Sequence, residues 1–154
     1  MKIKYCYFGL VKLNEKETLI DHLFSIQRLI LKFSQQYEIN GVFYYAHQSF
    51  FHCLEGDADV IDILLSKLEQ LQILYSCKHV NAVDTVSYSS WSMRYVTKDS
   101  EIFEFLKARN LNKFQPLALD SSDREKLVTV IEAQYTTNKV KSKKGYKVRG
   151  YKAY

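Results

Sequence analysis

The chain has 154 residues and a formal net charge of +5, and 47% of its residues are hydrophobic, including 12 Tyr and 9 Phe. With one Pro and five Gly, this composition excludes a disordered chain or a loop-rich scaffold, and the length suits one domain with a substantial core. The three cysteines do not have disulfide-like spacing, which favours a reducing compartment. The N-terminus has no apolar leader, and no apolar run is long enough to span a bilayer. We therefore expect a cytoplasmic protein without a membrane partner.

The positive charge is concentrated in a basic tail, residues 139–154. The tail holds seven of the 22 Lys and Arg residues and no acid, which leaves 15 basic against 17 acidic residues, or −2, in the rest of the chain. We therefore expect any attraction to nucleic acid or to acidic surfaces to lie in this tail. The competing interpretation is a solvated tail, or one docked on the acidic body, so nucleic acid is not expected as the main partner.

The first half of the chain predicts a strand followed by a long helix. Residues 2–9 alternate as a strand does, and Gly9 ends the run. Apolar residues then recur at helical spacing, which predicts an amphipathic helix over residues 15–35. Asn14 with Glu17 three residues later suggests a capping box at its start.

A hairpin should follow this helix. Asn40-Gly41 opens a strand over residues 42–46, and a second strand covers residues 50–55 after a short connection. In the second strand one set of side chains should face the core, namely Phe50, His52 and Leu54. The alternate set, Phe51, Cys53 and Glu55, points to the other face of the strand. We interpret His52 as a core histidine satisfied by one hydrogen bond, with a functional role as the alternative.

The remaining elements complete an α+β fold. A helix over residues 58–75 and strands over 78–87 and 90–97 give the order βαββαββ, which predicts a ferredoxin-like five-stranded sheet with two helices on one face. Tyr5, Tyr7, Phe51 and Cys53 should then line the other face. Helices near residues 100–110 and 122–137, separated at Pro116, would cover this second face. The expected organisation is a domain over residues 1–97, a helical cap over 98–138 and the basic tail.

Three sequence segments carry a resemblance to a known family: Ile39-Asn40-Gly41, Phe50-Phe51-His52-Cys53-Leu54-Glu55-Gly56 and Trp91-Ser92-Met93. Together with the element order, they resemble the BLUF domain, a family of blue-light sensors that use FAD. The match covers residues 1–97, and the helices after it resemble the C-terminal cap of short, stand-alone BLUF proteins. The resemblance implies signal transduction by a non-enzymatic regulatory protein, with a protein partner or a second copy of the chain contacting the cap and tail.

The resemblance also implies a set of flavin-site residues. Tyr7 matches the photoactive tyrosine, and the essential glutamine of the family is replaced by His52. A flavin-ring asparagine corresponds to Ser34, and a threonine before the second-strand glycine to Asn40. The full set implied for a retained flavin is Tyr7, Ser34, His52, Lys67, Trp91 and Met93, where Lys67 matches a basic residue that reaches the FAD phosphates.

The departures from the family pattern weaken the expected flavin site. The family's photocycle rearranges a glutamine amide, which has an acceptor and two donors, whereas a neutral imidazole has one of each on opposite edges. Ser34 is shorter than asparagine, and Leu71-Gln72-Ile73-Leu74 replaces an Asp-x-Arg-His stretch that carries cationic groups. We therefore expect a regulatory protein that binds no cofactor, with an FAD-binding blue-light photoreceptor as the alternative.

Other classes find little support in the sequence. His47, His52, His79, Cys53 and Cys77 show no metal-ligand spacing, so we expect no metal site. No nucleophile signature of a hydrolase and no phosphate-binding glycine loop is present, so we expect no catalytic residues.

Overall fold

The computed structural model describes residues 1–13, 16–71, 77–82 and 88–144, with the backbone alone over 77–82 and 136–144. The α+β class predicted from the sequence is confirmed. The elements are β1 (Lys2–Leu10), α1 (Leu19–Gln36), β2 (Asn40–Ala46), β3 (Ser49–Asp57), α2 (Ala58–Gln70), β4 (Cys77–Ala82), β5 (Trp91–Tyr95), α3 (Glu101–Lys107), the 3-10 turn η1 (Pro116–Ala118) and α4 (Ser121–Lys144).

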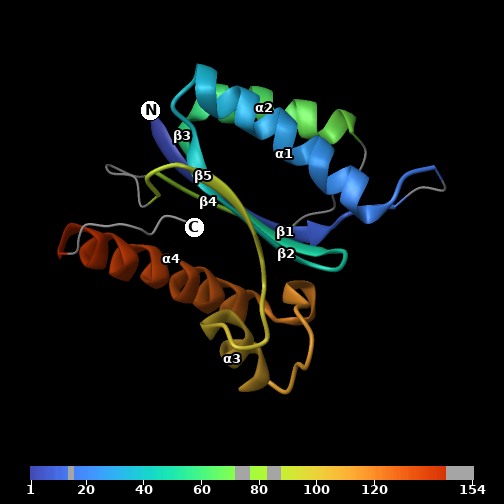
Figure 1. Cartoon of the computed structure of the whole chain (residues 1–154), viewed down its shortest axis with the longest axis vertical. Helices are drawn as coiled ribbons and strands as arrows, with labels where there is room; N and C mark the ends of the chain where they lie inside the picture. The colour runs from blue at the N-terminus through green and yellow to red at the C-terminus, as the bar shows by residue number, and fades with distance from the viewer. Residues whose placement is uncertain (14–15, 72–76, 83–87, 145–154) are drawn as a thin grey trace.

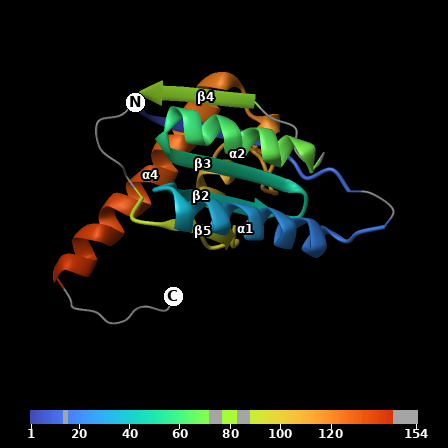
Figure 2. The same cartoon turned by 90° about the horizontal axis from the view of Figure 1, so that it is seen from above.

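The strands form one mixed sheet in the order β4-β1-β3-β2-β5. The pairs β1–β3, β1–β4 and β2–β3 are antiparallel, while β2 and β5 run parallel. As Figures 1 and 2 show, α1 and α2 lie side by side on one face of this sheet, and α3 and α4 lie on the opposite face. The central position of β3 places its side chains between these two helical layers.

The N-terminus of α1 differs from the prediction. The helix begins at Leu19 rather than at residue 15, because Thr18 caps it: the Thr18 hydroxyl accepts from the Asp21 amide at 3.2 Å and the Asp21 carboxylate accepts from the Thr18 amide at 3.1 Å. This reciprocal pair satisfies amide groups that have no partner within the helix. The predicted box at Asn14 and Glu17 is therefore wrong, and Asn14 itself lies outside the described residues.

Other predicted boundaries shift by several residues. The helix predicted over 58–75 ends at Gln70, and the strand predicted over 78–87 is described as β4 only as far as Ala82. Residues 72–76 and 83–87 lie outside the described part of the chain. The last helix continues to Lys144, beyond the predicted end at residue 137, so the basic tail begins inside a helix.

Two separate cores lie on the two faces of the sheet. The core under α1 and α2 includes Ile26, Ile30, Phe50 and Leu54, and the core under α3 and α4 includes Phe8, Phe51, Cys53, Leu106 and Leu127. The alternation of β3 produces this division, since successive side chains of a strand point to opposite faces. The prediction that the C-terminal helices cover the second face therefore agrees with the packing.

Tyr5 and Tyr7 lie on the opposite face from the one predicted. Residues directly opposite one another in an antiparallel pair share a face, and Tyr7 lies opposite His52. Tyr5 and Tyr7 accordingly join the α1/α2 core. The sequence correctly predicted that the side chains of the first strand alternate between the two faces. Only the register of β1 against β3 shows which of these side chains lie on the same face as His52.

A buried ionic group links the sheet to α4. The carboxylate of Glu55 on β3 is fully buried, and the Lys4 ammonium on β1 lies 3.5 Å from it and also pairs with Glu132 of α4. The second oxygen of Glu55 accepts a hydrogen bond from the Tyr88 amide at 3.0 Å. The pKa of Lys4 is raised: burial alone would lower it, but the hydrogen bond and charge of Glu132 together with Glu55 outweigh this effect.

Replacing Lys4 should therefore destabilise the fold strongly. Lys4→Met removes the cation that lies 3.5 Å from the buried Glu55 carboxylate, and breaking a buried ion pair in this way costs about 3–5 kcal/mol of unfolding free energy. Lys2→Met is the matched control, because Lys2 lies on the same strand and is exposed, and a change within about 0.5 kcal/mol is expected. Urea unfolding measures both, and equal losses in the two variants would contradict the role of the buried pair.

Candidate functional site

Three buried side chains on the α1/α2 face form a hydrogen-bonded chain. The Tyr7 hydroxyl oxygen lies 2.7 Å from His52 Nδ1, and Trp91 Nε1 donates to His52 Nε2 at 3.0 Å. Tyr7 is 3% exposed, His52 0% and Trp91 6%. His52 is thus a core histidine, as expected, but both of its ring nitrogens have a partner where one hydrogen bond was predicted.

Aromatic rings surround this chain. The Phe43 ring lies 5.1 Å from both the His52 ring and the Phe50 ring, and Phe50 meets Tyr7 edge-on at 5.5 Å between centroids. The register explains these contacts, since Phe43 on β2 lies opposite His52. Such packing fixes the imidazole in one orientation and keeps water away from it.

Gly41 belongs to β2, the strand between β3, which carries His52, and β5, which carries Trp91. It lies opposite Trp91 in the parallel register, and its φ of +151° is one that residues with side chains rarely adopt. An added Cβ would come 1.9 Å from the Cys53 carbonyl oxygen. Gly41 of the Ile39-Asn40-Gly41 segment is therefore required by the backbone next to the site.

Burial keeps His52 and Tyr7, the two titratable residues of this hydrogen-bonded group, neutral. Burial lowers the pKa of His52 to about 3. Burial, with a smaller effect from Tyr5, raises the pKa of the Tyr7 phenol well above its ordinary value. At neutral pH the imidazole therefore carries one proton and the phenol keeps its own.

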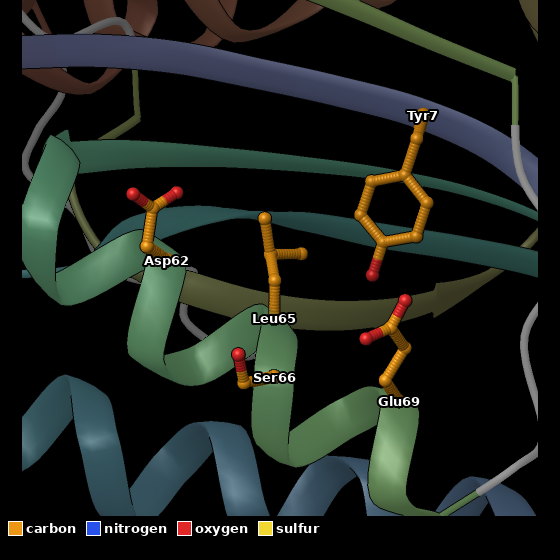
Figure 3. Close-up of a pocket in the computed structure, with 5 residues that line it drawn as sticks. All are labelled: Tyr7, Asp62, Leu65, Ser66 and Glu69. Carbon is orange, nitrogen blue, oxygen red and sulfur yellow. The ribbon is translucent and has the colours of Figure 1, made fainter.

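A cavity of about 270 Å³ opens beside Tyr7. Figure 3 shows the Tyr7 hydroxyl directed toward the Glu69 carboxylate across this cavity. The lining residues are Tyr7 from β1 and Asp62, Leu65, Ser66 and Glu69 from α2. The four α2 residues were missed from the sequence, although their spacing of three, four and seven positions places them on one side of a helix.

The other predicted site residues are placed differently. Ser34 on α1 donates its hydroxyl to the Leu31 carbonyl oxygen at 2.9 Å and so turns back onto its own helix. Lys67 on α2 is exposed, while Met93 on β5 is partly buried against the α1/α2 core. The structure thus brings Tyr7, His52 and Trp91 into contact, with Met93 on the same face. The departures expected at residues 72–74 lie outside the described residues.

Metal ligands do not gather in the part of the chain that the structure describes. No group of three or more His, Cys, Asp or Glu side chains there could hold an ion. Cys6 and Cys53 are buried thiols with their sulfurs 3.0 Å apart, and His47 lies in the turn between β2 and β3. Among these same residues, no helix has the length and apolar character needed to cross a membrane.

The fold is similar to several solved structures. BlsA in its ground state is 30% identical, with a TM-score of 0.65, and the match covers 86% of this chain and 88% of that one. BlsA in its photo-activated state is 27% identical, with a TM-score of 0.68 over 86% and 95% of the two chains. BlrB, a BLUF protein in its dark state, shares the fold at 18% identity and a TM-score of 0.59, over 86% and 96%. No protein-family profile and no curated protein matches the chain.

The buried His52 should make stability depend on pH. Its pKa is about 3 in the folded chain and about 6.5 when exposed, so the unfolded chain binds the extra proton between these values. The stability contribution is complete above pH 6.5 and falls by about 1.4 kcal/mol per pH unit below it.

The comparison of wild type with His52→Gln isolates this effect, because glutamine does not titrate and all other groups are shared. Between pH 7 and pH 4.5, wild type should lose about 2.5 kcal/mol more unfolding free energy than the variant. Urea unfolding at both pH values measures the difference. Parallel losses in the two proteins would show that His52 does not have the lowered pKa.

Proposed function

The chain belongs to the BLUF family. We propose that it is a regulatory protein that acts through protein contacts, with flavin binding and photochemistry weakened or lost. The observation that carries the proposal is the position of His52, whose two ring nitrogens are held by Tyr7 and Trp91. The proposed role is non-enzymatic, as the family resemblance implies for a short, stand-alone BLUF protein, and the chain matches BlsA over 95% of that protein's length.

The replacement of an amide by an imidazole supports this proposal. The resemblance implies a glutamine that exchanges hydrogen bonds between the tyrosine and the flavin. A glutamine amide could bond Tyr7 and still offer another group to a ligand, whereas the imidazole has one donor and one acceptor. Both are used within the protein, so His52 has no hydrogen bond left for a flavin ring.

The residues beside Tyr7 also do not fit FAD well. The diphosphate of FAD is anionic, yet the described residues that line the cavity include the carboxylates of Asp62 and Glu69 and no cationic side chain. Ser34 uses its hydroxyl within α1, and the exposed Lys67 is absent from the lining. Each missing charge-assisted contact costs about 1.5–3 kcal/mol, so loss of two lowers affinity by several powers of ten.

A second candidate function is an FAD-binding blue-light photoreceptor. The similarity to BlsA favours it, because that protein is 30% identical over most of its length and has a photo-activated state. This chain also keeps Tyr7, Trp91 and Met93 on one face of the sheet. The similarity of the whole fold therefore favours a flavin photoreceptor, whereas the hydrogen bonds at His52 favour the regulatory protein without photochemistry.

An absorbance spectrum separates the two candidates. The freshly purified protein should be colourless or carry far less than one flavin per chain, measured after acid release. After loading with excess FAD, blue light should cause no persistent red shift of the flavin band. A yellow protein with a reversible red shift would overturn the first candidate and support the second.

The double variant His52→Gln/Ser34→Asn is the gain-of-function test. It restores the amides that the resemblance implies at both positions, so its flavin occupancy should exceed that of wild type. Each single variant serves as a control, because it shows which of the two amides contributes. Equal occupancy in all four proteins would show that these positions do not limit flavin binding.

The proposed output surface is the C-terminal layer with the basic tail. The layer covers one face of the sheet, and the tail adds positive charge to an otherwise acidic chain. An acidic protein partner or the acidic body of a second copy would complement this charge. Nucleic acid could be bound by the same basic residues of the tail, but we do not propose it as the main partner.

Removing tail charges should weaken binding to a polyanion. We expect the full-length variant with Lys147, Arg149 and Lys152 changed to Gln to elute from heparin at lower salt than wild type. The matched control changes three exposed lysines of the body, Lys32, Lys98 and Lys113, to Gln. Equal shifts in both variants would contradict a tail-specific role, because they would reflect net charge alone.

A further inference from the structure

The hydrogen-bonded chain through His52 has a direction. The indole of Trp91 can only donate, so His52 Nε2, at 3.0 Å from it, must accept and carries no proton. Burial keeps the imidazole neutral at pH 7, so its single proton lies on Nδ1. Nδ1 is the atom 2.7 Å from the Tyr7 hydroxyl, and His52 therefore donates to Tyr7.

This direction leaves the hydroxyl proton of Tyr7 available for another acceptor. The phenol stays protonated, and the proton cannot point to Nδ1, which is already protonated. Figure 3 shows the hydroxyl directed into the cavity lined by α2 residues. Tyr7, which is 97% buried, thus directs this hydroxyl donor into a space large enough for a small ligand.

We propose that Trp91, acting through His52, fixes Tyr7 as a hydrogen-bond donor into this cavity, and that the cavity takes a ligand with a neutral acceptor such as a carbonyl. The Leu65 side chain supplies an apolar wall, while Asp62 and Glu69 disfavour an anionic acceptor. Trp91 is a positioning residue in this arrangement. This assignment rests on the proposed function in one respect, namely that a ligand would bind at the face of the sheet covered by α1 and α2.

The tautomer of His52 tests the direction. In full-length protein with ¹⁵N-labelled histidine, two-bond proton–nitrogen correlations should show His52 Nδ1 protonated and Nε2 unprotonated, with the signals assigned by their loss in His52→Gln. Tyr7→Phe should keep this tautomer, because Trp91 still donates to Nε2. Trp91→Phe should shift the ring toward the Nε2-protonated form, because Tyr7 can then donate to Nδ1. An Nε2-protonated wild type would overturn the proposal, even if Trp91→Phe does not fold.

A pair of probes of the same shape tests the ligand class. Acetophenone carries a carbonyl where ethylbenzene has a methylene, and one added hydrogen bond should make it bind about tenfold more tightly in ligand-observed NMR. Tyr7→Phe should remove this preference and leave ethylbenzene unaffected. Equal affinities in wild type, or no binding of either probe, would overturn the ligand assignment. Flavin content is measured separately, so failure here is distinguishable from failure of the proposed function.

Discussion

The central strand β3 buries a polar side chain on each face of the sheet, and the surrounding structure is arranged to satisfy both. His52 enters the α1/α2 core and is bonded by Tyr7 and Trp91, while Glu55 enters the opposite core and pairs with Lys4. A buried polar group without a partner costs free energy, and a buried charge costs more. These requirements tie β3 to its neighbours in the sheet and, through Lys4 and Glu132, to α4.

The function proposed for the α1/α2 face depends on which hydrogen bonds His52 can exchange. In a BLUF domain with glutamine at this position, the amide can donate and accept at one edge and can reverse its orientation. The imidazole of His52 is held at both edges, and reversing its bond to Tyr7 would require the bond from Trp91 to be lost. A fixed group thus stands where the family resemblance implies an exchangeable one, and the proposed regulatory role rests on this difference.

The opposite face of the sheet is linked to α4 by an ionic contact. Glu55 follows His52 by three residues on β3, and Lys4 links its carboxylate to Glu132 of the last helix. A displacement of β3 at the site would therefore alter an ionic contact that holds α4. Lys4 thus connects the strand that carries His52 to the last helix through Glu55 and Glu132.

The sequence by itself determined the α+β class, the strand–helix order and the need for a second helical layer, because periodicity and apolar content are local properties. The family resemblance also named Tyr7, His52 and Trp91 among six flavin-site residues, and these three lie in contact in the structure. Only the tertiary structure decided that Tyr7 shares a face with His52, that Thr18 rather than Asn14 begins α1, and that Ser34 bonds its own helix. Strand register, capping geometry and hydroxyl orientation depend on partners distant in the chain. For the same reason Lys4 could not be paired with Glu132 from the sequence, since 128 residues separate them and the packing of α4 on the sheet brings them together.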